Sequence, residues 1–130
     1  MPGLSFGDRR VFLEQLSQAG WDVEDWDLVR GVGAKVDLHA EAEYSSRSSV
    51  LRLEIPTGQP YMVFQMSQPD GELVLRLRLY PRDDLGSMIN EIIAAQDLLD
   101  DDTHPQLVKS LIPLSKRVVL ETAEGLFALS

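Results

Sequence analysis

Three arginines, a tyrosine and a histidine lie at alternate positions of segments with β-strand character, and they are the best candidates for a ligand site. These residues are His39, Arg52, Tyr61, Arg76 and Arg78. Residues two apart in a strand share one face of a sheet, and guanidinium groups and aromatic rings suit an anionic ligand or stacked bases. The alternative is a solvated face with cross-strand ion pairs, each worth about 0.2–1 kcal/mol.

Acidic residues offer two further arrangements. Glu41 and Glu54 fall on neighbouring predicted strands, where they either share a proton for acid–base chemistry or are screened neighbours. Residues 97–104 gather four aspartates and a histidine, and hard cations prefer clustered carboxylates. The spacing does not fit the twelve-residue calcium loop, so we interpret this segment as a loop between two helices.

Other catalytic and metal-binding signatures are absent from the sequence. There is no cysteine, and the only two histidines, His39 and His104, belong to no HExxH motif. The pattern GxSxG occurs at residues 3–7, but no predicted strand precedes it, so it forms no nucleophile elbow. We therefore expect no metal site and no cofactor, and the sequence favours a non-catalytic role.

Two tryptophans, Trp21 and Trp26, stand among four acidic residues. Tryptophan is enriched at the centres of protein interfaces, so both are candidate partner-binding residues. The alternative is that they seal the core beneath the first helix.

The formal net charge of −9 and a pI near 4.5 limit the classes of partner. Nucleic acids and anionic membranes repel such a chain. No apolar run is long enough to cross a bilayer, and the first twenty residues have no signal-peptide pattern. We predict a cytoplasmic protein that binds a protein partner or a second copy of itself.

Four successive strands are predicted from alternation of apolar and polar residues. Residues 73–80 alternate most strictly, since four leucines share one face; residues 34–44, 50–55 and 61–67 follow the same pattern. The short, turn-rich connections predict hairpins in which Leu53 lies opposite Phe64, Glu43 opposite Arg52, and Phe64 opposite Leu75. Residues 26–30 are predicted as an edge strand.

Helices are predicted on either side of these strands. Residues 8–19 form the first, with Asp8 as its cap, and residues 83–99 form the second. A third runs from Pro105 to about Ile112. Residues 117–121 and 126–129 are predicted as two closing strands, which extend the main sheet, pair only with each other, or pair with another subunit.

Together these elements predict one α+β domain over residues 1–130. It is an antiparallel β-meander of four or more strands, with an N-terminal helix and two later helices packed on one face and a C-terminal β-hairpin. In size, charge and element order the chain resembles secretion chaperones and stress regulators of the α+β class, which implies an adaptor or chaperone-like binding module. The run of four strands and a helix also resembles the unit of Whirly-type single-strand binders. The alternative function is a small-anion or small-ligand binding protein or enzyme that uses the polar sheet face.

Overall fold

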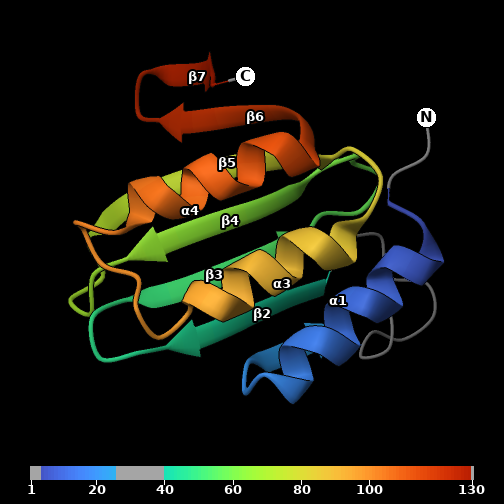
Figure 1. Cartoon of the computed structure of the whole chain (residues 1–130), viewed down its shortest axis with the longest axis horizontal. Helices are drawn as coiled ribbons and strands as arrows, with labels where there is room; N and C mark the ends of the chain where they lie inside the picture. Colours follow the sequence, from blue (N-terminus) through green and yellow to red (C-terminus); the bar gives the residue numbers. More distant parts are fainter. Residues whose placement is uncertain (1–3, 26–39, 130) are drawn as a thin grey trace, which may run out of the picture.

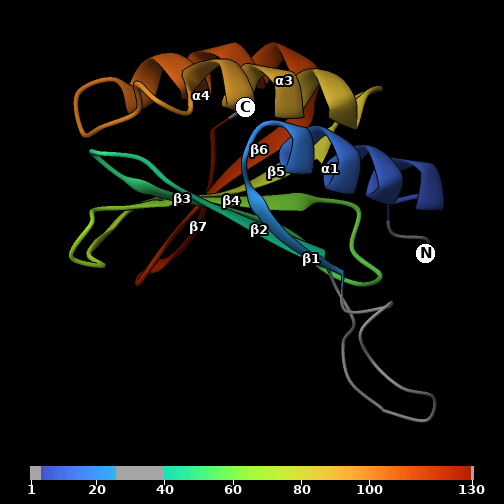
Figure 2. The same cartoon turned by 90° about the horizontal axis from the view of Figure 1, so that it is seen from below.

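The computed structural model describes residues 4–25 and 40–129, which form a seven-stranded antiparallel sheet with helices on one face (Figures 1 and 2). The strands lie in the sheet in chain order, from β1 to β7. They are β1 (Asp22–Asp25), β2 (Ala40–Ser45), β3 (Val50–Ile55), β4 (Met62–Ser67), β5 (Leu73–Pro81), β6 (Ser115–Thr122) and β7 (Gly125–Ala128). The helices are α1 (Phe6–Gln18), α3 (Leu85–Ala95), α4 (His104–Leu111) and the 3-10 turn η1 (Ile112–Leu114). The predicted fold class is confirmed.

The core lies between the sheet and the helices. Leu53, Phe64 and Leu77 stand side by side on three neighbouring strands and are fully buried. Met88 and Ile92 of α3 cover them from the helix layer and are also fully buried. Strand alternation therefore sends one side of each central strand into the core, which leaves the other side for polar residues.

The helix starts follow local capping chemistry. Ser5, not the predicted Asp8, caps α1: the Ser5 side chain accepts from the Asp8 backbone N–H while Asp8 bonds back to Ser5. This reciprocal capping box satisfies two backbone donors, so the helix begins earlier than the sequence pattern suggested. Asp84 caps α3, and Pro105 occupies the first turn of α4.

The predicted register is correct for two hairpins and wrong for the third. Glu43 lies opposite Arg52, and Leu53 lies opposite Phe64, as expected. Phe64, however, lies opposite Leu77 and not Leu75. A tight turn pairs Gln68 with Glu72, and an irregularity between Met66 and Ser67 adds a residue. The pairing moves by two positions, so each side chain keeps its face but gains a different neighbour.

The C-terminal hairpin extends the main sheet, because β6 pairs with β5 and β7 pairs with β6. At the other edge, β1 pairs with β2. The predicted edge strand over residues 26–30 and the first part of the predicted strand over 34–44 lie outside the described residues. Across the described residues, no helix has the length and apolar character needed to cross a membrane.

Candidate functional site

The sheet face that points away from the helices carries the predicted arginines. Arg76 lies opposite Gln65, which lies opposite Arg52. Arg78 lies in the adjacent row, opposite Val63 on one side and Val119 on the other. The structure thus brings Arg52, Arg76 and Arg78 onto one surface, which we call the polar face. His39 lies outside the described residues.

Glu121 of β6 joins two of these arginines. Its carboxylate accepts from Arg76 Nε at 2.5 Å and from Arg78 Nε at 2.6 Å. Burial opposes the ionisation of Glu121, but the hydrogen bonds from Arg78 and Arg76 outweigh it and hold the pKa of Glu121 below its ordinary value. Burial lowers the pKa of Arg78, but the hydrogen bond to Glu121 helps to outweigh it, so the pKa of Arg78 is raised. Both guanidinium groups are therefore paired with a carboxylate of their own chain.

Further ion pairs continue across the polar face. Arg52 donates to Glu41 at 2.7 Å and lies 3.8 Å from Glu54. Burial alone would lower the pKa of Arg52, but these two carboxylates outweigh it and raise that pKa. Arg76 reaches Glu54 at 3.9 Å and donates to Gln65 at 2.5 Å. Glu41 and Glu54 lie opposite one another, as predicted for paired carboxylates, with Arg52 beside both. The Arg52 guanidinium therefore partly offsets the negative charge of Glu41 and Glu54.

Tyr61 belongs to a second feature of the polar face, a pair of tyrosine rings with a guanidinium group against each ring. The Arg78 guanidinium lies 4.8 Å from the centre of the Tyr61 ring, and Tyr61 and Tyr80 pack with their centres 5.2 Å apart. The Arg117 guanidinium lies 5.5 Å from the centre of the Tyr80 ring. Each of these cations thus contacts an aromatic face within the chain. An anionic ligand would have to displace these contacts or those to Glu121.

An open hollow of about 340 Å³ lies over β1, β2 and β3 on the polar face. It is lined by Asp22, Val23, Glu24, Glu41, Ala42, Glu43 and Arg52. Because four carboxylates surround a single guanidinium group, the charge of this hollow favours a cationic ligand. Among the residues that the structure describes, however, no three acidic or histidine side chains are grouped so that they could hold a metal ion.

Of the two tryptophans predicted to bind a partner, the structure describes Trp21 only. Trp21 is only 4% exposed, donates from Nε1 to Gln96 Oε1 at 2.6 Å, and stacks on Tyr44. Trp21 therefore lies in the core, as in the alternative in which the tryptophans seal the core beneath the first helix. Its part in partner binding stays a prediction. Trp26 lies outside the described residues.

The aspartate-rich segment between α3 and α4 organises its own loop. Asp100 accepts from the backbone N–H groups of Asp102 and Thr103 at 2.8 and 2.9 Å, and these hydrogen bonds lower the pKa of Asp100. Asp97 accepts from the Tyr44 hydroxyl, which raises the pKa of Tyr44. Asp101 accepts from Gln68 Nε2 at 3.0 Å. Three of the aspartates therefore hold parts of the fold together.

A second hollow, which the sequence did not indicate, lies between α3 and α4. It is an apolar groove of about 260 Å³, lined by Glu91, Ala94, Ala95, Leu98, Leu99, Thr103, Gln106, Leu107 and Ser110. We call it the α3–α4 groove. Leu98 at its rim is 72% exposed, whereas Leu99 and Leu107 are buried. Leu98 therefore extends the apolar lining of the groove to its exposed rim.

Comparison of the chain with protein-family models, curated proteins and solved structures found no match.

Two residues that sequence reasoning missed now stand out. Glu121 was predicted within a strand, but its link to Arg76 and Arg78 depends on β6 pairing with β5. Leu98 was placed inside the second predicted helix, whereas α3 ends at Ala95 and leaves it at the rim of the groove. The sequence did contain a signal for Glu121, because Val118 and Leu120 alternate with it and place it on the opposite face of the strand. It contained no signal that distinguishes Leu98 from a leucine of the core.

Proposed function

We propose that the protein is a non-catalytic protein-binding module whose α3–α4 groove receives an amphipathic helix with basic flanks from a partner protein. The observation that carries this proposal is the open apolar groove, with Glu91 in its lining and Asp102 at the loop end of the two helices. The adaptor-like role expected from the sequence is thereby assigned to a particular surface, the α3–α4 groove.

The groove has the shape that a helix requires. Its α3 side is formed by Glu91, Ala94, Ala95 and Leu98, and its α4 side by Thr103, Gln106, Leu107 and Ser110. Both sets follow the spacing i, i+3, i+4, i+7, with Leu98 in the turn just after α3 and Thr103 just before α4. Small side chains on both sides leave the hollow open. An apolar stripe of a third helix can lie along such a groove, as in other helix-in-groove complexes.

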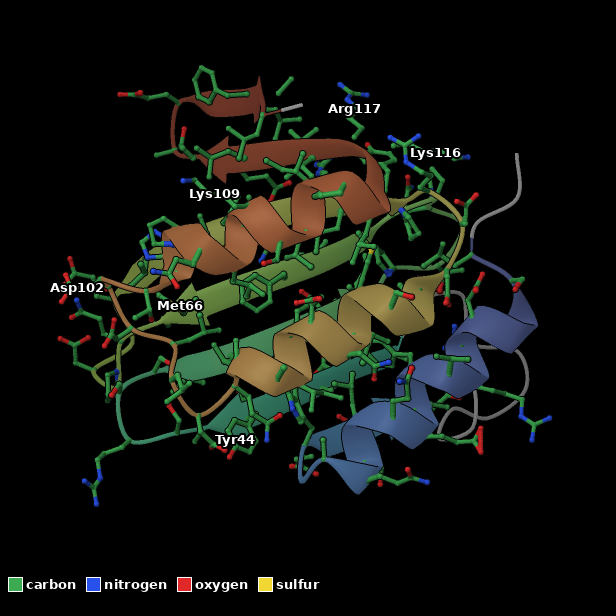
Figure 3. The ribbon with its side chains drawn as sticks, in the orientation of Figure 1. Tyr44, Met66, Asp102, Lys109, Lys116 and Arg117 are labelled. Carbon is green, nitrogen blue, oxygen red and sulfur yellow. The ribbon has the colours of Figure 1, made fainter. Side chains whose placement is uncertain are left out.

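The charge around the groove selects the flanks of the partner. Residues 85–111 contain five acidic side chains, Glu91, Asp97, Asp100, Asp101 and Asp102, against the single cation Lys109. Figure 3 shows Asp102 at the loop end of the two helices. Lysine or arginine residues beside an apolar stripe would be attracted by these acidic residues, of which Glu91 lies in the groove lining itself, and this attraction would speed association and exclude acidic competitors.

The size of the groove disfavours a small-molecule site. Its volume of about 260 Å³ falls below the ~300–1,000 Å³ that is usual for ligand pockets. It also lacks the convergent charged groups that catalysis needs, since Glu91 is the only titratable residue in its lining. The groove suits one or two anchoring side chains.

A designed peptide tests the proposal directly. The probe is an amphipathic peptide of about 16 residues, with leucines at the spacing i, i+3, i+4, i+7 and lysines elsewhere. Its binding is measured by fluorescence anisotropy, and the site is located from the amide chemical shifts of Ala94, Leu98 and Gln106. A peptide with glutamates in place of the lysines is the matched control, and it should bind at least tenfold more weakly.

The variant Leu98→Ser should raise the Kd of the lysine peptide about tenfold or more, because burial of one leucine contributes about 1.5–3 kcal/mol. Leu126→Ser, which removes an exposed leucine from β7, should leave it unchanged. Equal binding of both peptides, or shifts confined to residues outside the groove, would refute the proposal. In this function the cytoplasm is the expected location, and nucleic acid is not the expected partner, because the chain carries a net charge of −9.

A further inference from the structure

The two edges of the sheet differ in how they are protected against pairing. Edge strands expose unpaired backbone groups, and charges or prolines normally block them. In β1, three of the four residues are acidic: Asp22, Glu24 and Asp25. β7 has the sequence Gly-Leu-Phe-Ala, with neither charge nor proline. The β7 edge is therefore open to another strand.

The backbone of β7 shows which groups are available. Leu129 N–H donates to Val118 at 2.8 Å, so these two residues form a hydrogen-bonded pair between β6 and β7. In an antiparallel pair, hydrogen-bonded and non-hydrogen-bonded pairs alternate. Leu126 and Ala128 are thus in non-hydrogen-bonded positions, and their N–H and C=O groups point to the outer edge. No strand in the described part of the chain pairs with that edge.

The side chains of β7 are also uncovered. Along one row of the sheet Leu77 is fully buried, Leu120 is partly buried and Phe127 is 47% exposed. Leu129, opposite the fully buried Val118, is 40% exposed. Burial therefore falls steadily toward the edge, because α4 lies over β5 and leaves β7 beyond the helix layer (Figure 1).

The charges near β7 select a second copy of this chain. Lys116 and Arg117 lie at the start of β6, near the C-terminal end of β7 (Figure 3), and Glu124 lies in the turn at the other end of the hairpin. Antiparallel pairing of β7 with its own copy brings the turn of each hairpin beside the cations of the other. Opposite charges then meet twice across a two-fold axis.

We propose that the protein forms a symmetric dimer through antiparallel β7–β7 pairing, which joins the two sheets into one. Leu126 and Ala128 of each copy supply the backbone hydrogen bonds, and Phe127 and Leu129 of both copies cover each other on the helix side. This interface is separate from the α3–α4 groove. Because β7 has only four residues, the dimer dissociates on dilution.

Sedimentation velocity and residue-resolved amide hydrogen exchange test the proposal on the whole protein. Between about 1 µM and about 500 µM the sedimentation coefficient should rise from that of a monomer to that of a dimer. Over the same range the exchange of the Leu126 and Ala128 amides should slow at least tenfold. The amides of Phe127 and Leu129 face β6, so they should be protected at both concentrations.

Variants separate the β7 edge from other interfaces. Leu126→Pro removes an outward N–H, which an edge strand tolerates, and it should weaken the dimer at least tenfold. Leu98→Ser serves as its matched control and should leave the dimer unchanged. Lys116→Glu and Glu124→Lys should each weaken the dimer about two- to fivefold, and the double variant should restore it.

Three results would overturn the proposal. These are a monomer at every concentration, a dimer in which the Leu126 and Ala128 amides still exchange freely, and a dimer that Leu126→Pro does not weaken. None of them affects binding of the peptide at the groove, so the two proposals fail independently.

Discussion

Replacement of Glu121 with glutamine tests whether the chain's own carboxylate holds two arginines of the polar face. Glutamine keeps the shape and one acceptor oxygen but removes the charge that Arg76 and Arg78 contact at 2.5 and 2.6 Å. A hydrogen bond to a charged group contributes about 1.5–3 kcal/mol, and an exposed ion pair only about 0.2–1 kcal/mol. The Glu121 side chain is 16% exposed and the arginine side chains 32% and 29%, so partial screening applies. We expect Glu121→Gln to lower the free energy of unfolding by about 1–2 kcal/mol.

Urea unfolding as a function of pH measures this effect. The pKa of Glu121 is lowered in the folded protein, so its contribution is fully present above the unfolded-state pKa of about 4.3. The contribution is lost as the pH falls further, through the lower folded-state pKa. The wild-type protein should therefore be more stable than Glu121→Gln at pH 7, and the difference should shrink below about pH 4.3.

Glu72→Gln is the control for a change of net charge alone. Glu72 is exposed in the turn before β5, and its replacement should change stability by less than about 0.5 kcal/mol. If Glu121→Gln unfolds at the same urea concentration as the wild type at pH 7, the ion-pair account of the polar face is wrong.

Three further predictions concern the core and the polar face. Leu77→Asp should prevent folding, because it places an unpaired charge at a fully buried position, and a cooperative thermal melt by circular dichroism would contradict this. Trp21→Phe should lower the free energy of unfolding by about 1–3 kcal/mol in urea titrations, because it leaves the buried Gln96 oxygen without its donor. Inorganic phosphate should raise the Tm of Glu121→Gln but not that of the wild type, and a rise in the wild type would instead support an anion site on the polar face.

The sequence predicted the fold well because one face of the sheet is buried. Leu53 and Leu77 each lie between two charged residues, and only one assignment of faces hides both of them together with Phe64. The β4–β5 register was predicted wrongly because alternation is unchanged by a shift of two residues. The turn after Met66 decides that shift, and its geometry is not visible in a hydrophobic pattern.

The candidate sites were less predictable because they depend on contacts distant in the chain. Arg76 and Arg78 were assigned correctly to the polar face, yet their partner Glu121 follows more than forty residues later. The ion pair requires β6 to join β5, one of three pairings that the sequence left open. The groove depends on where α3 ends and on the small residues that face α4, and Leu98 is indistinguishable from a core leucine in the sequence alone.

The order of strands in the sheet has a consequence for folding. Neighbours in the sheet are also neighbours along the chain, so successive short hairpin closures can assemble β2 to β5. Each closure costs little loop entropy. The step from β5 to β6 must wait, because α3 and α4 intervene. The middle of the sheet can therefore collapse before β6 and β7 join it, and Glu121 reaches its two arginines only in that later step.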